Sequence, residues 1–452
     1  MELTKNQDIE LFIESLTGEG SGVGRFDGLT VFVSGAAPGD TVSAHIIKVK
    51  KNYAIGKISK IIKPSKLRIS PQCQYFPSCG GCAFLHIDYK FEGEHKKERV
   101  KDAFKRLAHI DITPDEIIQV GNTRYRNKAQ YPVSFQNSEL KIGFFAPRTH
   151  RVINCGDCLL QPEIFSQIVS IIRKWIIENG ISVYDPDKRK GLIRHIYLRQ
   201  AEATKEIMVC LVINGDELIK SDKLIESLLV VSNIKSIVIN INEAETNVIL
   251  GKKCKTVWGS DYIYDVLCGV KIRLSPLSFY QVNHSGAEKL YEKAAEYAAL
   301  TGSETILDMY CGAGTIGLSM AKNAKKIIGV EIVPEAVEDA KVNAAENGIE
   351  NAEFFCGDAP AAAKMLKSHG ISPDIVILDP PRKGCEPELL KTVAEMNPKK
   401  IVYVSCDPAT LARDCEIFSS LGYAVQKLIA VDMFPRTVHV ECVCLLTRTE
   451  KP

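Results

Sequence analysis

The stretch TILDMYCGAGTIGL (305–318) decides the fold class of this chain, because it joins an apolar run to a glycine-rich turn. The run carries Asp308, and Gly312, Gly314 and Gly317 follow it at the spacing G-x-G-x-x-G. A buried strand, a turn whose backbone can approach a ligand closely, and a helix that starts at the turn form the ligand-binding unit of parallel α/β sheets. The stretch therefore predicts a ligand site at the carboxyl end of a strand.

Further apolar runs follow this stretch and alternate with alanine-rich helical segments. The strand-like runs are KIIGVEI (326–332), AEFFCGD (352–358), DIVILDPP (374–381) and KIVYVSC (400–406). Two final runs, at 424–434 and 438–446, are separated by only a few residues, which is too short for a parallel crossover. The pattern predicts an α/β fold, with a doubly wound, mostly parallel sheet that an antiparallel hairpin closes.

The chain has 452 residues, and single hydrophobic cores stop growing at roughly 250 to 300 residues. Residues 1–62 contain short alternating apolar runs with glycine-rich turns, which predict a small all-β barrel. Residues 63–270 mix loop, strand and helix signals and predict an α+β central domain. Residues 271–452 contain the α/β sheet, so we expect three domains.

The composition is that of an ordinary globular protein, with 45% hydrophobic and 25% charged residues. No apolar run approaches the ~18 residues of a membrane span, so we expect no contact with a bilayer interior. The first residues, MELTKNQDIE, lack the basic and apolar regions of a secretory signal, and we expect a cytoplasmic location. A net charge of +2 argues against a uniformly basic nucleic-acid binder.

Two segments nevertheless predict local contact with RNA. Between Lys48 and Arg68 there are eight Lys or Arg residues and no Asp or Glu, which suits phosphate binding. The segment TRYRNKAQYPV (123–133) interleaves cations with aromatic rings, a mixture that suits phosphate contact and base stacking. Its members of interest are Arg124, Tyr125, Arg126, Lys128 and Tyr131. A solvated charged face is the alternative for both segments.

Polar side chains follow the ends of all the predicted parallel strands, where α/β sheets bind ligands. In chain order they are Asp308 and Tyr310, Glu331, Asp358, Asp379 and Cys406. A carboxylate four residues before Gly312 can face an ammonium or sulfonium group, which favours S-adenosylmethionine. The closing hairpin favours the same ligand, whereas the glycine spacing alone also fits a dinucleotide. Glu331 can accept hydrogen bonds from the ribose of either ligand.

Cys406 and Glu441 are the candidate reactive pair. Cys406 in VSCDPATLARD (404–414) ends an apolar strand before a predicted helix, whose amides and dipole can lower the pKa of the thiol. Glu441 in FPRTVHVE (434–441) lies among valines, where burial would raise its pKa into the range of a base. A thiolate that adds to carbon 6 of uracil activates carbon 5, whose proton a base must later remove. A structural cysteine and an outward-facing strand carboxylate are the alternatives.

The segment PQCQYFPSCGGC (71–82) is rich in cysteine. Cys73, Cys79 and Cys82 follow the spacing C-x5-C-x2-C, and Cys155 and Cys158 come later in the chain. Three close cysteines in a loop of an intracellular protein indicate a metal site. Zinc more often takes cysteine pairs that are two to four residues apart, so the wider gap counts against zinc.

Together the motifs resemble those of the RNA uracil-5-methyltransferases. The motifs are LDMYCGAGTIG, ILDPPRKG, VSCDPATLARD and FPRTVHVE, with SFYQVN (278–283) upstream. The resemblance covers essentially the whole chain and implies a Rossmann-like class I methyltransferase sheet. It also implies that Cys406 is the nucleophile and Glu441 the base. The side chains that it implies for contact with S-adenosylmethionine are Gln281, Tyr310, Glu331, Asp358 and Asp379.

Within this family the resemblance is greatest to enzymes of 23S rRNA, which hold a 4Fe-4S cluster on such a cysteine triad and one distant cysteine. It implies Cys73, Cys79, Cys82 and Cys158 as ligands, with zinc as the lesser alternative and Cys155 as the competing fourth ligand. Residues 1–62 resemble the TRAM module, an RNA-binding OB-like barrel.

We therefore expect a monomer that methylates carbon 5 of a uridine in structured RNA and that binds neither membrane nor DNA. A tRNA substrate, carbon 5 of cytosine as the target, and a non-catalytic RNA-binding assembly factor are the alternatives.

Overall fold

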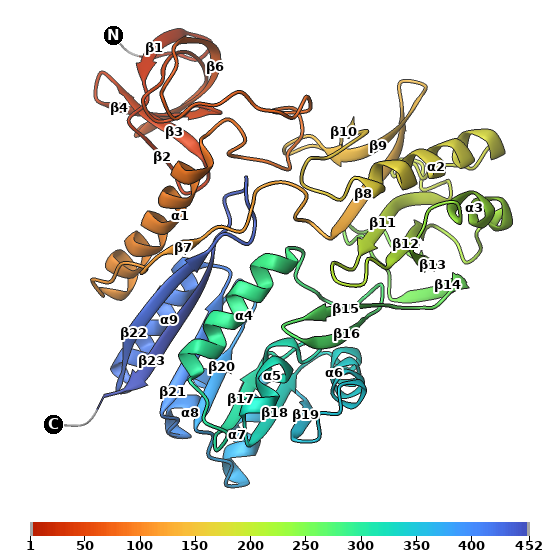
Figure 1. Ribbon diagram of the computed structural model, residues 1–452. Helices are drawn as coiled ribbons and strands as arrows, with labels where there is room; N and C mark the ends of the chain where they lie inside the picture. Colours follow the sequence, from red (N-terminus) through yellow and green to blue (C-terminus); the bar gives the residue numbers. More distant parts are fainter. Residues whose placement is uncertain (1–2, 450–452) are drawn as a thin grey trace.

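The computed structural model describes residues 3–449 (Figure 1). Residues 1–2 and 450–452, the outermost parts of the two expected end domains, lie outside the described residues. The described strands form a six-stranded, a seven-stranded, a two-stranded and an eight-stranded sheet along the chain. Within residues 3–449, no helix combines the length and the apolar character that a membrane span requires.

The N-terminal sheet has the strand order β1-β5-β6-β4-β3-β2. Its strands are β1 (Asp8–Phe12), β2 (Ser15–Leu16), β3 (Ser21–Phe26), β4 (Leu29–Ser34), β5 (Thr41–Val49) and β6 (Tyr53–Lys63). Buried and more exposed residues alternate along β1 and β5, so one face of the curled sheet covers an apolar core with Val31, Val33 and Ile46. Gly24 permits a close crossing, because a Cβ there would lie 2.4 Å from the carbonyl oxygen of Phe12. The expected β-rich N-terminal unit is confirmed.

The central sheet has the order β10-β9-β8-β11-β12-β13-β14, and its β12–β13 pair is parallel while the other pairs are antiparallel. Its strands are β8 (Lys128–Gln136), β9 (Glu139–Phe145), β10 (Val152–Asn154), β11 (Ile193–Gln200), β12 (Ile207–Ile213), β13 (Ile234–Ile241) and β14 (Lys253–Gly259). Helices α2 (Ile164–Asn179) and α3 (Ser221–Leu228) lie on this sheet and share its apolar core (Figure 1). The hairpin of β15 (Ile263–Leu267) and β16 (Val270–Leu274) leads to the last sheet.

The C-terminal sheet has the order β19-β18-β17-β20-β21-β23-β22-β7. Its long strands are β17 (Thr305–Met309), β18 (Lys326–Glu331), β19 (Ala352–Cys356), β20 (Ile375–Leu378), β21 (Lys400–Ser405), β22 (Tyr423–Val431) and β23 (Glu441–Arg448). The first five are parallel, and β23 lies antiparallel between β21 and β22. The predicted α/β sheet with a closing antiparallel hairpin is confirmed.

Two helical layers cover the C-terminal sheet. The helices are α4 (His284–Ala298), α5 (Thr315–Met320), α6 (Pro334–Glu346), α7 (Ala359–Ser368), α8 (Pro387–Glu395) and α9 (Pro408–Ser420). Leu290 of α4 and Ile316 of α5 belong to one apolar core, and Leu389 of α8 and Leu411 of α9 belong to the other. Alternate strand residues point to opposite faces, so each strand contributes to both cores.

A segment from the N-terminal half of the chain completes this last domain. Helix α1 (Tyr89–Ala103) continues into a π-helical turn (Phe104–Ala108), and β7 (Ile117–Ile118) pairs in parallel with β22. Val100 and Phe104 are fully buried in the same core as Leu411 of α9. Part of residues 63–270, which were expected to form the central domain, therefore packs on the C-terminal sheet (Figure 1).

Candidate active site

The register of the C-terminal sheet brings the ends of its parallel strands to one edge. Met309 pairs with Val330 on one side and with Leu378 on the other, and Leu378 pairs with Tyr403. The residues that follow these strands therefore lie along one edge of the sheet, where sheets of this kind bind ligands in a crevice.

Asp308 and the glycine turn form the floor of the crevice. The amide of Gly317 donates to Asp308 Oδ2 at 3.0 Å, and a Cβ on Gly317 would lie 2.9 Å from that oxygen. Asp308 Oδ1 is buried and has no hydrogen-bond partner among the described residues. Burial raises the pKa of Asp308 to about 7. One carboxylate oxygen thus fixes the start of α5, while the other is left for a donor group from a ligand.

Glu331 ends β18 beside the same turn. Its Oε2 accepts from the amide of Gly312 at 3.1 Å, and its Oε1 accepts from the amide of Val333 at 2.9 Å. These bonds fix the carboxylate, and each oxygen keeps a second lone pair for a ligand hydroxyl. Tyr310 adopts a left-handed φ of 64°, which turns the chain away from β17 toward the glycines.

Gln281 lies in the segment just before α4. Its side chain bonds the hydroxyl of Tyr291, which also lies 3.3 Å from Thr315 Oγ1. Burial and the charge of Asp379 raise the pKa of Tyr291 above its usual range. Tyr291 was not singled out from the sequence, because a tyrosine in the helical stretch 284–298 reads as an ordinary core residue.

Tyr310 and Asp358 lie at the rim. Tyr310 is half-buried beside Cys385, and Asp358 is exposed at the start of α7. Burial raises the pKa of Tyr310, and Asp358 contributes to this shift, so the two side chains are near one another. Of the side chains expected to contact the methyl donor, Asp358 is the most exposed, and their contact with the donor stays a prediction.

Cys406 and Glu441 lie beside one another on neighbouring strands. Ser405 pairs with Cys442 in the antiparallel ladder of β21 and β23, so the next register position joins Cys406 with Glu441. Burial raises the pKa of Cys406 to about 11, and the charges of Glu441 and Asp379 add to the shift while Arg382 opposes it.

The net pKa of Cys406 is raised and not lowered, although its own backbone amide acts in the expected direction. The side chain of Asp407 caps α9 and accepts from the amides of Ala409 at 2.8 Å and Thr410 at 3.4 Å. The capping carboxylate therefore occupies the helix amides that would have stabilised a thiolate. Burial and the charges of Glu441 and Asp379 therefore raise the pKa of the Cys406 thiol.

Glu441 is only 5% exposed, and burial raises its pKa to about 8, with Asp379 adding to the shift and Arg382 opposing it. An increase in the pKa of Glu441 through burial is what the sequence led us to expect. Burial also raises the pKa of Asp379 to about 7. A carboxylate with a pKa near neutral can accept a proton and release it again at physiological pH.

The loop that follows β20 carries Arg382, whose charge lowers the pKa of both Cys406 and Glu441, and buried hydrogen bonds hold this loop. Arg382 Nη2 lies 3.4 Å from the ring nitrogens of His439. Tyr403 donates to Asp414 Oδ2 at 2.6 Å, and the amide of Cys385 donates to the same oxygen at 2.8 Å. Asp414 could not be singled out from the sequence, because a single acidic residue in a helix gives no sign of burial.

The cysteine-rich segment lies against the loop that precedes α2. The amide of Gly156 donates to the hydroxyl of Tyr75 at 2.9 Å. After burial, Cys158 is the thiol that most raises the pKa of Cys82, and Cys73 and Cys79 add to the shift. The thiols thus share one neighbourhood, but within residues 3–449 no group of three or more ligating side chains is placed to hold a metal ion. The described side chains of the cysteine-rich segment therefore do not form the expected metal site.

The segment 123–133 is only partly available to RNA. Tyr131 is 4% exposed and donates to Gln161, so its expected role in base stacking was wrong. Arg124 is tied to Asp157 by two bonds of 2.7 Å. Arg126 remains near the rings of Tyr125 and Phe434, at 5.8 Å and 6.0 Å from their centroids.

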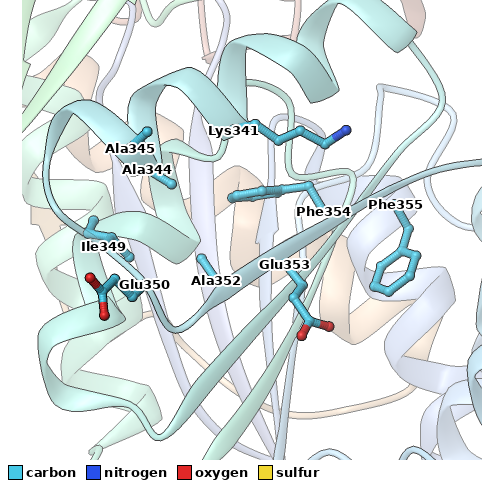
Figure 2. A pocket seen from close by; sticks show the side chains of 9 residues that line it. All are labelled: Lys341, Ala344, Ala345, Ile349, Glu350, Ala352, Glu353, Phe354 and Phe355. Atoms are coloured by element: carbon cyan, nitrogen blue, oxygen red, sulfur yellow. The ribbon is translucent and has the colours of Figure 1, made fainter.

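A cavity of about 580 Å³ lies away from the crevice, between α6 and the edge strand β19 (Figure 2). Phe354 and Phe355 line it, and its wall contains none of the residues expected to contact a methyl donor. The ring of Phe354 also supports the glycine turn from below, since a Cβ on Gly314 would lie 3.2 Å from it.

The sheet with its inserted hairpin and the crevice at its strand ends define a class I S-adenosylmethionine-dependent methyltransferase. The TRAM domain profile matches residues 2–59, and the tRNA (Uracil-5-)-methyltransferase profile matches residues 88–449. An RNA methyltransferase of Clostridium tetani is 45% identical over 445 residues, which cover 98% of this chain and 97% of that protein. One of Halalkalibacterium halodurans is 42% identical over 98% of each chain.

The crystal structure of the Pyrococcus abyssi tRNA (uracil-54, C5)-methyltransferase in complex with S-adenosyl-L-homocysteine has the same fold. It superposes with a TM-score of 0.78 at 28% identity and covers 97% of this chain and 99% of that one. The chain belongs to the tRNA (uracil-5-)-methyltransferase family and is an S-adenosylmethionine-dependent RNA methyltransferase.

Proposed function

We propose that this enzyme methylates carbon 5 of a uridine in 23S rRNA through a covalent bond between Cys406 and carbon 6. The observation that carries the proposal is the adjacent register of Cys406 and Glu441, with Arg382 and Asp379 close enough for their charges to act on the pKa of both groups. A nucleophile and a base that face the same space are what the reaction requires.

The steps can be assigned to the residues of this chain. Cys406 gives its proton to solvent and its sulfur adds to carbon 6, which places negative charge on carbon 5 and the carbonyl oxygen at carbon 4. When bound, S-adenosylmethionine would supply an electrophilic methyl group on a sulfonium: carbon 5 takes the methyl group, the bond between that methyl group and the sulfonium breaks, and S-adenosylhomocysteine leaves. Glu441 then removes the proton from carbon 5, the double bond re-forms, and the bond between sulfur and carbon 6 breaks. Arg382, which lowers the pKa of Cys406, favours the thiolate before addition and after release.

The methyl donor is assigned to the crevice beside the glycine turn. The unpaired Asp308 Oδ1 suits a cationic or N–H group of the donor, and Glu331 suits its ribose hydroxyls. Gln281, Tyr310, Asp358 and Asp379 complete the set proposed to surround it.

Trapping with fluorinated RNA tests this mechanism. RNA that contains 5-fluorouridine lacks the carbon 5 proton, so elimination stalls and a methylated protein–RNA adduct accumulates. We expect the adduct on denaturing gels with the wild type and with the control Cys254→Ala, whose thiol is exposed on β14, but not with Cys406→Ala. Donor-binding wild type that forms no adduct with either 23S rRNA or tRNA would contradict the mechanism.

The proposal that the substrate is 23S rRNA and not tRNA rests on the cysteine spacing of residues 73–82. We propose that the enzyme acts in the cytoplasm. Methylation of unmodified 23S rRNA but not of tRNA transcripts would support the proposed substrate, and the opposite preference would favour the tRNA alternative. Turnover on either RNA excludes a purely structural assembly factor.

We also propose a 4Fe-4S cluster on Cys73, Cys79, Cys82 and Cys158, with zinc as the alternative. The support is chemical: four thiols that share one neighbourhood are the usual ligands of such clusters. The charges of Cys73 and Cys79 act on both Cys155 and Cys158, and Cys158 is preferred because Cys155 is buried and donates its thiol hydrogen to the carbonyl of Asp157. Iron, sulfide and zinc analysis of protein purified without oxygen distinguishes the two metals, and Cys158→Ser should lower the metal content more than Cys155→Ser.

A further inference from the structure

The loop that joins β22 to β23, residues 432–440, delivers Glu441 to the site and is held by segments distant in sequence. The amides of Ala83 and Phe84 donate to the carbonyl of Arg436 at 2.7 Å and 3.1 Å. Tyr125 donates to the carbonyl of Pro435 at 2.9 Å. The path of this loop is therefore fixed from outside the catalytic sheet.

Four charged side chains lie buried at the base of this loop. Lys96 on α1 donates to Glu92 Oε1 and to Asp432 Oδ1, at 2.7 Å each, and to the carbonyl of Phe434 at 3.3 Å. The amide of Arg436 donates to Glu92 Oε1 at 2.7 Å, and its guanidinium donates to the carbonyl of Ile87 at 2.8 Å. We call Glu92, Lys96, Asp432 and Arg436 the buried quartet.

The quartet contains two cations and two anions, and none of its members is more than 6% exposed. Buried ion pairs rarely stabilise a fold more than apolar residues of the same size would, because desolvation offsets their attraction. Their directional bonds instead select one geometry. Here that geometry joins α1 to the start of the loop through Asp432, next to β22, and to the middle of the loop through Arg436.

The same helix reaches further toward the reacting groups. Arg99, one turn after Lys96, donates to the carbonyl of Val438, three residues before Glu441. His439, between them, lies near Arg382. One face of α1 thus contacts the loop from its first residue almost to the proposed base.

We infer that Lys96 is a positioning residue for the reaction: through Asp432 and the carbonyl of Phe434 it sets the loop so that the carboxylate of Glu441 faces carbon 5 in the covalent adduct. The inference rests on the proposed function, because it concerns the proton removal assigned to Glu441. It implies that loss of Lys96 slows elimination more than the addition of Cys406.

The test compares two lysines of α1 in the full-length enzyme. Lys96→Met removes the central cation of the quartet, whereas Lys101→Met removes a lysine on the same helix that pairs only with Glu98 at the surface. With 5-fluorouridine RNA, we expect both variants to form the Cys406 adduct at the wild-type rate. With natural uridine RNA, we expect Lys96→Met to accumulate the methylated adduct, because elimination slows roughly 10- to 100-fold.

A neutral second variant covers the case in which Lys96→Met fails to fold. In Lys96→Met/Asp432→Asn the charges of Glu92 and Arg436 still balance, and we expect the same accumulation of adduct. Elimination as fast as in Lys101→Met, or addition and elimination slowed equally, would overturn the role of Lys96 while leaving the covalent mechanism intact. A wild type that forms no fluorinated adduct would instead remove the proposed function and this inference together.

Discussion

The two reacting groups should respond to pH differently, and this difference can be measured step by step. Burial raises the pKa of Glu441 to about 8 and that of Cys406 to about 11. Between pH 7 and pH 9 the charged fraction of a group with a pKa of 8 rises about tenfold, from about 9% to about 91%. Over the same interval the charged fraction of a group with a pKa of 11 rises about 100-fold and does not level off.

Rapid-quench experiments at saturating S-adenosylmethionine separate the two steps. Formation of the 5-fluorouridine adduct reports addition of Cys406, and decay of the methylated adduct with natural uridine reports proton removal by Glu441. We expect addition to rise from pH 7 to pH 9 without levelling off, but by less than about 100-fold, because Glu441 becomes charged over the same interval and raises the pKa of Cys406. We expect elimination to rise about tenfold and then level off. In Glu441→Gln the elimination step should slow by roughly 10² to 10⁴ and lose its dependence on pH. Elimination that is independent of pH in the wild type, or that is retained in Glu441→Gln, would refute the assignment of the base.

Three further predictions concern the folded enzyme. Because the pKa of Glu441 is raised from 4.5 to about 8, the folded state binds its proton more tightly than the unfolded state does. The wild-type free energy of unfolding should therefore fall relative to Glu441→Gln as pH rises from 5 to about 8.5, and parallel curves in urea titrations would contradict this. Tyr403→Phe removes a buried 2.6 Å hydrogen bond and should cost about 1 to 3 kcal/mol in urea unfolding and also lower activity. Tyr423→Phe, which loses a buried bond far from the site, should lower only stability, and equal activities for both variants would count against the support role of Tyr403. Gly317→Ala places a carbon 2.9 Å from Asp308 Oδ2 and should weaken S-adenosylmethionine binding in calorimetry; unchanged affinity would exclude this close contact as a requirement.

The parts of the fold that the sequence predicted are those with a local signal. The run that ends at Asp308 and the glycines after it encode a strand, a tight turn and a helix within a few residues. Because parallel strands end at a common edge, the positions of Glu331, Asp379 and Cys406 along the chain were enough to place them around one crevice.

The parts that the sequence did not predict depend on contacts between distant segments. Helix α1 is rich in charge and reads as a solvated helix, yet Lys96 is fully buried. The raised pKa of Cys406 depends on Glu441 and Asp379, which lie on other strands. Tyr131 is buried against Gln161, which lies in a later loop, and the sequence pattern around Tyr131 does not predict this contact.

The contact between α1 and the last hairpin has a consequence for how the chain is made. Lys96 and its partner Asp432 are 336 residues apart. At the usual ~5 to 20 residues per second of synthesis, the helix leaves the ribosome roughly 15 to 70 seconds before its partner exists. Val100 and Phe104 are fully buried in the finished enzyme, in a core whose buried members beyond the π-helical turn begin only at Leu307. The catalytic domain can therefore complete its assembly only after nearly the whole chain has emerged.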